Sequence, residues 1–582
     1  MTNAEVAEIF ERIALILDIK GNENPFRIRA YERAALLIGS LSRNLRELYD
    51  EGGLKRLEGL PGIGKDLALK IEEILQTDKL RYLKKIEKGI PPGLLEILDI
   101  EGVGPKKTKL LWQKFKVKDI ESLKKLAESG KLQKVKGWGE KTVQNILRGI
   151  TLRKQMAGRL PIGDLLPLAE EIVEALKRTG LCNRIEIAGS LRRRRDTCGD
   201  IDILATSMNP EAVMEAFCTL PHVKNVTNKG KTKSTVFLKI GIDADLRVVE
   251  PDVFGAALHY FTGSKDHNVA VRKMAVRKGV TMSEYGVFKG TAEKKGALVA
   301  AHTEEEVFKT VGLPYIAPEL RENWGEIEAA QKEVLPTLIA DTDLQGDLHT
   351  HSTFSDGTES IVTMAKAAKA KGLQYIALTD HASAMGMVKG IKKETIKHYL
   401  KAIEDARRKV PGIHILAGAE VDILKDGSLY LSDDLLAQLD WVTASIHQSF
   451  RDSREANTAR LIKAIQNPYV CAIGHPTTRI LGKREPIDLN IDAVLSEAKK
   501  NNVAMELNAS PVRLDLQDIH LKRAKELEAT IVINSDAHST TGLDCRYGIM
   551  QARRGWLEKH NILNTKPWEE LAKWLEGRKG KE

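Results

Sequence analysis

A series of short apolar segments, each ending in histidine or acidic residues, constrains the fold of residues 344–571 more than any other feature. The segments end at Asp347-Leu348-His349-Thr350-His351, Thr379-Asp380-His381, Gly418-Ala419-Glu420, Ser445-Ile446-His447, Ile473-Gly474-His475 and Ser535-Asp536-Ala537-His538. Stretches with helical periodicity separate most of them. Parallel strands that alternate with helices place their carboxyl ends on one face of a barrel. The pattern therefore predicts a β/α barrel with polar side chains at that face.

Histidine is concentrated in the same part of the chain, with ten of the fourteen histidines after residue 340. A single histidine at a strand end is most often a satisfied core residue, but that explanation does not account for the whole series. Mixed imidazole and carboxylate ligands suit Mn²⁺, Zn²⁺ or Fe²⁺ better than Mg²⁺. We therefore expect a metal-binding domain.

A second pattern lies upstream, where an apolar run leads into Gly189-Ser190 and a further apolar run carries Asp200 and Asp202. Strand side chains alternate between faces, so the two aspartates point the same way. Asp245, in a later strand, can add a third carboxylate. Three converging carboxylates can hold two Mg²⁺ ions. The alternative is a solvated edge strand with alternating acids, and the third strand favours nucleotidyl transfer.

The turn before these aspartates has the residues that a phosphate needs. Gly189-Ser190 lets backbone N–H groups approach an anion, and Arg193 adds a cation.

Three copies of a glycine hairpin recur at roughly forty-residue spacing in the first 160 residues, each followed by helical periodicity. They are Leu60-Pro61-Gly62-Ile63-Gly64-Lys65, Ile100-Glu101-Gly102-Val103-Gly104-Pro105-Lys106 and Val135-Lys136-Gly137-Trp138-Gly139-Glu140-Lys141. They resemble helix-hairpin-helix motifs, whose backbone N–H groups bind a phosphodiester without reading bases. One copy alone is more often a plain helix connection.

Charge supports a nucleic-acid partner for the same region. Residues 1–160 carry 32 Lys and Arg against 22 Asp and Glu, so all of the formal net charge of +10 lies there. The alternative is a solvated basic surface. The five cysteines are widely spaced without a CxxC pair and read as reduced thiols. With no run of eighteen apolar residues and no secretory signal, we expect a soluble cytoplasmic protein, or a nuclear one in a eukaryote.

The strand aspartates, together with Tyr260-Phe261-Thr262-Gly263-Ser264, make residues 1–317 similar to a family X DNA polymerase related to polymerase beta. The resemblance implies that Asp200, Asp202 and Asp245 are catalytic and hold two Mg²⁺ ions. It implies nucleotide contacts at Arg159, Gly189, Ser190, Arg193, Gly199, Tyr260, Phe261, Gly263 and Asn268. Lys265 replaces an acidic residue of polymerase beta and could raise dNTP affinity without template help.

The resemblance also implies DNA contacts at the hairpins and at Arg272, which lies four residues after Asn268 on one helix face. The hairpin residues are Gly62, Gly64, Lys65, Gly102, Gly104, Lys106, Gly137, Gly139 and Lys141. Lys70 falls at the family's Schiff-base lysine, so 5′-deoxyribose-phosphate lyase chemistry is a hypothesis. The alternative is a lysine that contacts DNA phosphate, because Arg27 and Asp66 replace lysines of the family.

Residues 344–571 resemble a PHP (polymerase and histidinol phosphatase) domain. The resemblance implies nine metal ligands, namely His349, His351, Asp356, His381, Glu420, His447, His475, Asp536 and His538. It also implies two or three Mn²⁺ or Zn²⁺ ions, 3′→5′ exonuclease action, and processing of abasic or blocked ends. A polymerase core followed by a PHP domain is the arrangement of bacterial PolX enzymes.

We therefore predict a multidomain chain. Its parts are a helical helix-hairpin-helix domain (1–80), a second one resembling polymerase fingers (81–158), an α/β nucleotidyltransferase palm (159–251), an α+β thumb (252–317), a linker (318–343) and a distorted β/α barrel (344–571). The predicted function is gap filling in DNA repair by a monomer that binds gapped or nicked duplex DNA and dNTPs, with repair proteins as further partners. Alternatives are a template-independent or RNA nucleotidyltransferase and a non-catalytic DNA-end scaffold with an inactive PHP domain.

Overall fold

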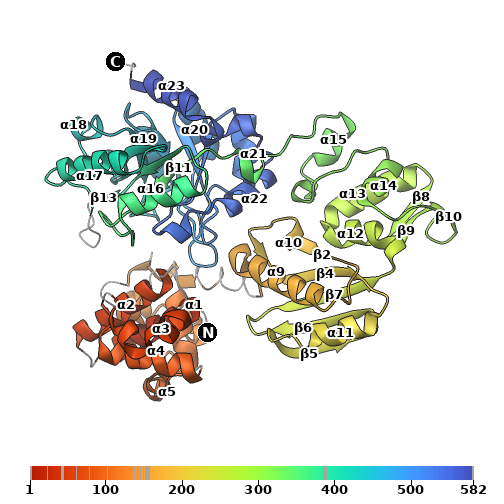
Figure 1. Ribbon diagram of the computed structural model, residues 1–582, viewed down its shortest axis with the longest axis horizontal. Coiled ribbons are helices and arrows are strands. Elements are labelled where there is room, and N and C mark those ends of the chain that lie inside the picture. The colour runs from red at the N-terminus through yellow and green to blue at the C-terminus, as the bar shows by residue number, and fades with distance from the viewer. Residues whose placement is uncertain are drawn as a thin grey trace.

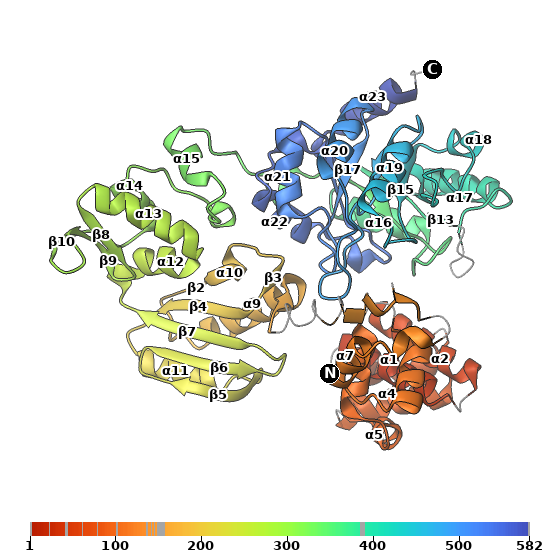
Figure 2. The same cartoon turned by 180° about the vertical axis from the view of Figure 1, so that it is seen from behind.

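The computed structural model describes residues 3–21, 24–40, 45–60, 62–77, 79–100, 103–135, 138–140, 142–144, 146–147, 150, 158–383 and 390–579. Figures 1 and 2 show three bodies in chain order, a helical N-terminal body, a central body with two sheets, and a C-terminal barrel. In the described residues, no helix is long and apolar enough to cross a membrane. The predicted fold class is confirmed for the helix-hairpin-helix region, the thumb and the barrel.

The N-terminal body contains two apolar cores. The first lies among α1 (Asn3–Lys20), α2 (Pro25–Ser40), α3 (Leu45–Glu58), α4 (Lys65–Thr77) and α5 (Arg81–Glu87). The second lies among η1 (Pro92–Asp99), α6 (Pro105–Phe115), α7 (Ile120–Glu128), η2 (Leu132–Lys134) and the side chains of Trp138, Val143, Ile146 and Ile150. Amphipathic spacing produces both cores, because each helix buries one apolar stripe against its neighbours.

The palm is a five-stranded mixed sheet with strand order β2-β4-β7-β6-β5. Its strands are β2 (Arg184–Ile187), β4 (Asp200–Thr206), β5 (Val223–Lys229), β6 (Lys233–Leu238) and β7 (Asp243–Val249). Helices α9 (Ile162–Arg178) and α11 (Pro210–Cys218) bury their apolar faces against it. The short helix α10 (Gly189–Arg192) follows β2, and the short strands β1 (Leu160–Pro161) and β3 (Thr197–Cys198) pair beside it.

The thumb combines helices with a three-stranded antiparallel sheet of order β10-β9-β8. Its elements are η3 (Pro251–Val253), α12 (Phe254–Thr262), α13 (Lys265–Arg277), β8 (Val280–Ser283), β9 (Gly286–Gly290), β10 (Lys295–Ala300) and α14 (Glu304–Thr310). The chain then runs through η4 (Pro318–Leu320), α15 (Glu326–Gln331) and η5 (Asp341–Asp343) to the barrel.

The C-terminal barrel is built from parallel strands in the order β11-β12-β14-β15-β16-β17-β18, with β13 paired to β14. The strands are β11 (Gly346–Thr350), β12 (Tyr375–Leu378), β13 (His381–Ala382), β14 (His414–Asp422), β15 (Trp441–Ser445), β16 (Ala472–Ile473), β17 (Ala504–Asn508) and β18 (Ile531–Asn534). A parallel bridge from Thr350 to Ala537 nearly closes the barrel between its first and last strands.

Helices surround the barrel, and alternation along its strands separates two cores. The helices are α16 (Ile361–Ala370), α17 (Ile396–Lys409), α18 (Asp433–Leu436), α19 (Arg454–Ile465), α20 (Ile491–Lys500), α21 (Asp518–Glu526), α22 (Arg546–Arg554) and α23 (Trp568–Lys579), with η6 (Thr540–Gly542), η7 (Lys559–Asn561) and η8 (Leu563–Thr565). Ile376 and Leu378 face the helices, whereas Tyr375 and Ala377 join a second cluster that packs on Leu571 of α23. Successive strand residues point to opposite faces, so the second cluster fills the barrel.

The barrel packs directly on the palm. Leu514, in the loop after β17, and Tyr547 of α22 are buried in the palm core. Arg479 donates from Nη1 to Asp196 Oδ2 over 3.0 Å and from Nε to the carbonyl of Arg513 over 2.8 Å. These contacts fix one face of the palm against the carboxyl ends of the barrel strands.

Candidate active sites

The nine predicted ligands come together at the carboxyl ends of the barrel strands. Eight of them form three groups, and within each group the ligand atoms lie within 4.8 Å of one another. The groups are His351, Asp356, His381 and His538; His349, His351 and Asp536; and His381, Glu420 and His447. His475 adjoins the third group, with Nε2 2.9 Å from Glu420 Oε1. Strands β11, β13 and β14 and the loops after β11, β15, β16 and β18 therefore supply one cluster.

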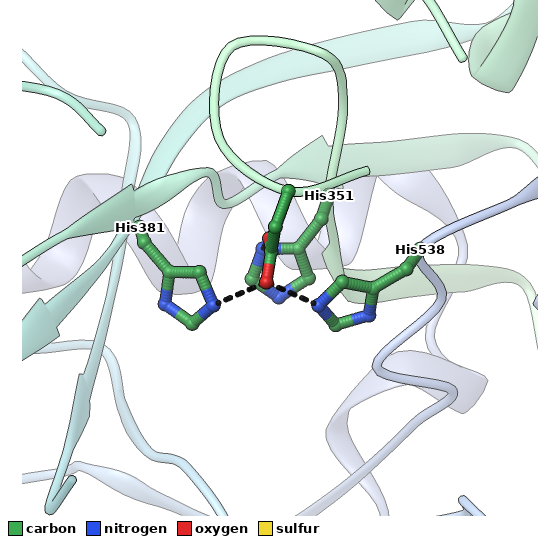
Figure 3. A group of neighbouring side chains, drawn as sticks. His351, His381 and His538 are labelled. Atoms are coloured by element: carbon green, nitrogen blue, oxygen red, sulfur yellow. Dashed lines mark ion pairs between the residues drawn. The ribbon is translucent and has the colours of Figure 1, made fainter. Parts of the chain in front are cut away.

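Asp356 and Glu420 are the two carboxylates around which the imidazoles gather. Figure 3 shows His351, His381 and His538 directed toward one carboxylate, which belongs to Asp356. His381 Nε2 lies 3.4 Å and His538 Nε2 lies 3.3 Å from Asp356 Oδ2. Glu420 Oε2 lies 2.8 Å from His381 Nδ1, and its Oε1 lies 3.1 Å from His447 Nε2.

The ring nitrogens fit a metal centre. His349 Nδ1 lies 2.6 Å from Glu506 Oε1, and His447 Nδ1 lies 2.8 Å from Asp422 Oδ1. Each ring therefore turns its other nitrogen toward the cluster, as histidine ligands with a carboxylate partner do. Among the described residues, His349 Nε2, both ring nitrogens of His351 and His475 Nδ1 are buried without a hydrogen-bond partner. Buried polar atoms rarely lack partners, so a cation fits there.

Electrostatics keeps the carboxylates of this cluster charged. Burial alone would raise the pKa of Glu420, but the charges of His447, His381 and His349 hold it well below its usual range. Burial and the adjacent His538 and His381 lower the pKa of His351 to about 3. A neutral imidazole among ionised carboxylates is the protonation state that binds a metal ion.

Sequence reasoning missed Glu506 and Asp422, which hold the two histidines, and it missed Arg513. Glu506 is the third residue of β17, in the strand for which no ligand was predicted, and it also accepts from the backbone N–H of His475 over 2.6 Å. Asp422 ends β14, two residues after Glu420. Period-two alternation after a predicted ligand is the signal that could have identified Asp422.

Arg513 places a cation beside the candidate metal ligands. Its Nε lies 3.7 Å from Asp536 Oδ2, and its Nη1 is buried without a hydrogen-bond partner among the described residues. Burial and the charge of Arg513 lower the pKa of His475. A guanidinium group repels metal cations, so its place beside this cluster suits an anionic ligand such as phosphate.

The palm aspartates lie at adjacent positions of two parallel strands. The register of β4 and β7 pairs Asp202 with Asp245 and Asp200 with Asp243. Asp200 and Asp202 are two residues apart on one strand face, as expected. Lys233 Nζ lies 3.0 Å from Asp245 Oδ2, and Thr235 donates to Asp245 Oδ1 over 2.5 Å.

Mutual repulsion raises the pKa values of the palm aspartates, as expected of carboxylates gathered at a candidate cation site. Burial and the charges of Asp200 and Asp245 raise the pKa of Asp202 to about 7. Burial and the charge of Asp245 also raise the pKa of Asp200. Gly189 has φ 60° and lies so close that a Cβ there would meet Asp202 Oδ2 at 2.1 Å. Only glycine fits this turn, which brings the backbone directly against the carboxylate.

The predicted nucleotide residues surround this turn. Arg159 donates to the Thr197 carbonyl over 2.5 Å, and a Cβ on Gly199 would lie 3.7 Å from Arg159 Nη1. Arg193 Nη1 donates to the Thr262 carbonyl over 2.5 Å and would lie 3.1 Å from a Cβ on Gly263. The structure thus joins the turn after β2, which contains Ser190, to the end of α12.

The thumb side of this site is held by α12 and α13. The rings of Tyr260 and Phe261 pack edge to face with centroids 5.1 Å apart. Asn268 donates to the Tyr260 carbonyl over 2.8 Å, and Arg272 lies 5.8 Å from the Tyr260 ring centroid. Lys265 is exposed at the first position of α13.

The three hairpins share one backbone hydrogen bond. The backbone N–H groups of Ile63, Val103 and Trp138 donate to the carbonyls of Leu60, Ile100 and Val135 over 3.0, 3.0 and 2.9 Å. A Cβ on Gly62, Gly64, Gly104 or Gly139 would meet nothing within 4 Å, so these turns face open space. Lys65 and Lys106 are exposed at the starts of α4 and α6. Gly102, Gly137 and Lys141 lie outside the described residues.

Lys70 is buried in α4 and paired within its own helix. Its Nζ lies 2.6 Å from Asp66 Oδ1 and 5.1 Å from the ring centroid of Tyr82. The nitrogen that would have to attack the sugar in Schiff-base chemistry is therefore occupied by a carboxylate.

Models of known families match most of the chain. They are a helix-hairpin-helix domain over residues 1–80, a SAM-like helix-hairpin-helix tandem over 94–151, the DNA polymerase beta thumb over 257–322 and the PHP domain over 347–510. The thumb model ends at Glu322, beyond the end of the predicted thumb at residue 317.

Curated proteins match both the whole chain and its parts. The "DNA polymerase/3′-5′ exonuclease PolX" of Bacillus subtilis (strain 168) is 38% identical over 578 residues, which cover 99% of each chain. "DNA polymerase lambda" of Rattus norvegicus is 25% identical over 55% of this chain and 56% of its own. A "probable phosphatase" of Thermoanaerobacter sp. (strain X514) is 37% identical over 33% of this chain and 78% of its own. The chain belongs to the PolX family of DNA polymerases, in which a family X polymerase precedes a PHP domain.

Proposed function

We propose that this protein is a DNA-directed DNA polymerase that fills short gaps in repair, and that its barrel is a metal-dependent 3′→5′ exonuclease. The polymerase activity is inferred chiefly from the strand register, which places Asp202 beside Asp245. Asp200 lies two residues before Asp202 on the same strand face. The PolX relative and the polymerase lambda relative support it by their names. Three glycine hairpins with open faces support a DNA substrate.

In the polymerase reaction, the primer 3′-oxygen attacks the α-phosphate of a dNTP and pyrophosphate leaves. Two Mg²⁺ ions bound by the aspartates would lower the pKa of the primer 3′-OH and neutralise the triphosphate. The turn at Gly189 and the guanidinium of Arg193 hold the triphosphate. Tyr260 and Phe261 line the position of the sugar. Lys233 must release Asp245 when a cation binds, because it occupies one oxygen at 3.0 Å.

In the nuclease reaction, a hydroxide attacks the terminal phosphodiester and the 3′-oxygen of the shortened strand leaves. Two or three Mn²⁺ or Zn²⁺ ions held by the nine ligands would supply that hydroxide near neutral pH. Glu506 and Asp422 fix the rings of His349 and His447. Arg513 pairs with a non-bridging phosphate oxygen and counters the charge that develops there.

Lyase chemistry at Lys70 is not part of the proposal, because Asp66 holds its ammonium group at 2.6 Å. A template-independent nucleotidyltransferase is the second candidate, favoured by the exposed Lys265 beside the nucleotide turn.

Primer extension and primer degradation on gapped DNA test both activities together. We expect Asp200→Ala with Asp202→Ala to abolish nucleotide addition while degradation persists, because metal ligands provide several kcal/mol of transition-state stabilisation. Comparable extension with and without a template strand, or with NTPs in place of dNTPs, would favour the second candidate. Unchanged extension by the double variant would refute the polymerase assignment.

A further inference from the structure

One buried carboxylate joins the polymerase nucleotide turn to the barrel domain. Glu322, between η4 and α15, accepts from Arg193 Nε over 3.1 Å and from Arg554 Nη1 over 3.0 Å. Arg195 Nη1 lies 3.7 Å from the same oxygen. Although burial alone would raise the pKa of Glu322, the guanidinium groups of Arg554, Arg193 and Arg195 hold it below its usual value. Glu322 is therefore ionised at neutral pH.

Arg554 belongs to α22 of the barrel, yet it reaches the polymerase turn directly. Its Nη1 also donates to the backbone carbonyl of Arg193 over 2.7 Å. Its Nε and Nη2 bond Asp518 of α21 over 2.9 and 2.6 Å. Its side chain is fully buried. In both views, α10 lies near the end of α22 (Figures 1 and 2).

These contacts restrain Arg193 at three points. Its Nε is held by Glu322, its Nη1 by the Thr262 carbonyl, and its own carbonyl by Arg554. A guanidinium group has five N–H donors in a fixed plane, so Nη2 remains to bind an anion while the other nitrogens are held. Side-chain entropy is lost before the ligand arrives, which strengthens binding.

We propose that Arg554 is a positioning residue for the polymerase reaction, which sets the guanidinium of Arg193 for the dNTP triphosphate through Glu322 and the Arg193 carbonyl. The inference rests on the proposed nucleotide transfer. It makes the barrel domain a structural part of the nucleotide site, in addition to being a nuclease.

The test compares Arg554→Ala with Arg553→Ala in the full-length protein. Arg553 is the adjacent residue of α22 and also joins the barrel to η4, through Glu319 at 2.8 Å. Within the described part of the chain, its hydrogen bonds go to Glu319 and the Ile339 carbonyl and not to Arg193 or Glu322. We expect the KM for dNTP on gapped DNA to rise about tenfold in Arg554→Ala, equivalent to about 1.4 kcal/mol. The kcat should change less than threefold, and Arg553→Ala should keep the parental KM.

Two further variants separate positioning from a general loss of structure. Arg554→Lys retains the charge and should recover part of the lost dNTP affinity. Glu322→Gln leaves the bonds of Arg554 to Asp518 and to the Arg193 carbonyl, so it tests the proposal even if Arg554→Ala does not fold. Its KM should also rise. Titration of a non-hydrolysable dNTP should show the same order of affinities, and primer degradation should stay at the parental rate.

Equal KM values for Arg554→Ala and Arg553→Ala would overturn the positioning role. A lower KM in Arg554→Ala or Glu322→Gln would also overturn it, because Glu322 would then compete with the triphosphate for Arg193. If the parental protein incorporates no nucleotide, the proposed function fails and the inference fails with it, whereas normal incorporation with equal KM values removes the inference alone.

Discussion

At the scale of single residues, paired charges decide which side chains are available for chemistry. His349 and His447 each hold a carboxylate on Nδ1 and turn Nε2 toward the cluster. In Lys70, by contrast, the ion pair with Asp66 occupies the side-chain nitrogen that would react. Arg513 keeps a buried nitrogen without a partner among the described residues.

Replacement of Arg513 by glutamine should lower the kcat/KM for primer degradation by about tenfold or more, because a charge-assisted hydrogen bond to phosphate contributes about 1.5–3 kcal/mol. Metal content, measured by mass spectrometry, should be unchanged or higher, since a repulsive cation is removed. Inorganic phosphate should inhibit this variant less than the parent.

Arg523→Gln provides the matched control, because Arg523 is paired with Asp492 on the surface of α21. Loss of bound metal in Arg513→Gln, with no change in phosphate inhibition, would contradict the assigned role.

At the scale of elements, the thumb depends on a buried charge network. Glu304, at the start of α14, bonds Arg192 Nη2 over 2.6 Å and Arg321 Nη1 over 2.5 Å. Burial alone would raise the pKa of Glu304, but these guanidinium groups lower it to about 2. The network ties α10 of the palm to the thumb.

Acid should weaken the thumb as Glu304 is protonated. Its pKa is depressed in the folded state, so its contribution is fully present above the unfolded value of 4.5 and is lost as the pH falls toward 2. The difference corresponds to about 3 kcal/mol. Glu304→Gln should therefore lower the melting temperature at pH 7 and flatten its dependence on pH between 5 and 2, as measured by calorimetry. An unaltered pH dependence would argue against the network.

The hairpins are the second case at this scale, since the same backbone hydrogen bond recurs at three places. Lys106→Glu should weaken the binding of gapped DNA and reduce the slope of log K against log salt by about one. Lys125→Glu, an equal charge change at an exposed residue of α7, is the control.

DNA with a 5′-phosphate in the gap should bind better than intact duplex to the parent protein. Equal affinities for the two DNAs, measured at one salt concentration, would argue against recognition of the gap.

At the scale of the whole molecule, the two candidate centres lie in separate domains that share an interface. Arg479 and Leu514 bind the barrel to the palm, and Arg554 carries the contact to the nucleotide turn. The two reactions should therefore be separable by substitution, although the domains are not independent.

His349→Ala with His351→Ala should abolish primer degradation and leave nucleotide addition, because the palm aspartates are unaffected.

Mn²⁺ should raise the melting temperature of the parent protein, since a ligand at one hundred times its Kd stabilises by about 2.7 kcal/mol. The double variant should lose this shift. Mn²⁺ should also support degradation better than Mg²⁺. Full degradation by the double variant would assign the barrel a structural role.

The sequence by itself determined the chemistry of each segment and its local geometry. Alternation along a strand placed Asp200 and Asp202 on one face, glycine spacing identified three hairpins, and polar residues at strand ends indicated the barrel and its ligands. These features depend on residues a few positions apart in the chain, so they can be recognised from the order of the residues alone. The predicted fold was confirmed for this reason.

Only the tertiary structure decided which charged groups meet. Glu506 holds His349 across 157 residues, and Arg554 reaches the Arg193 carbonyl across 361 residues. No periodicity links such pairs, because their approach depends on how the sheets, helices and domains pack. Burial and neighbouring groups decide whether an arginine is restrained for a ligand and whether a lysine is paired with a carboxylate. Both exist only in the folded chain.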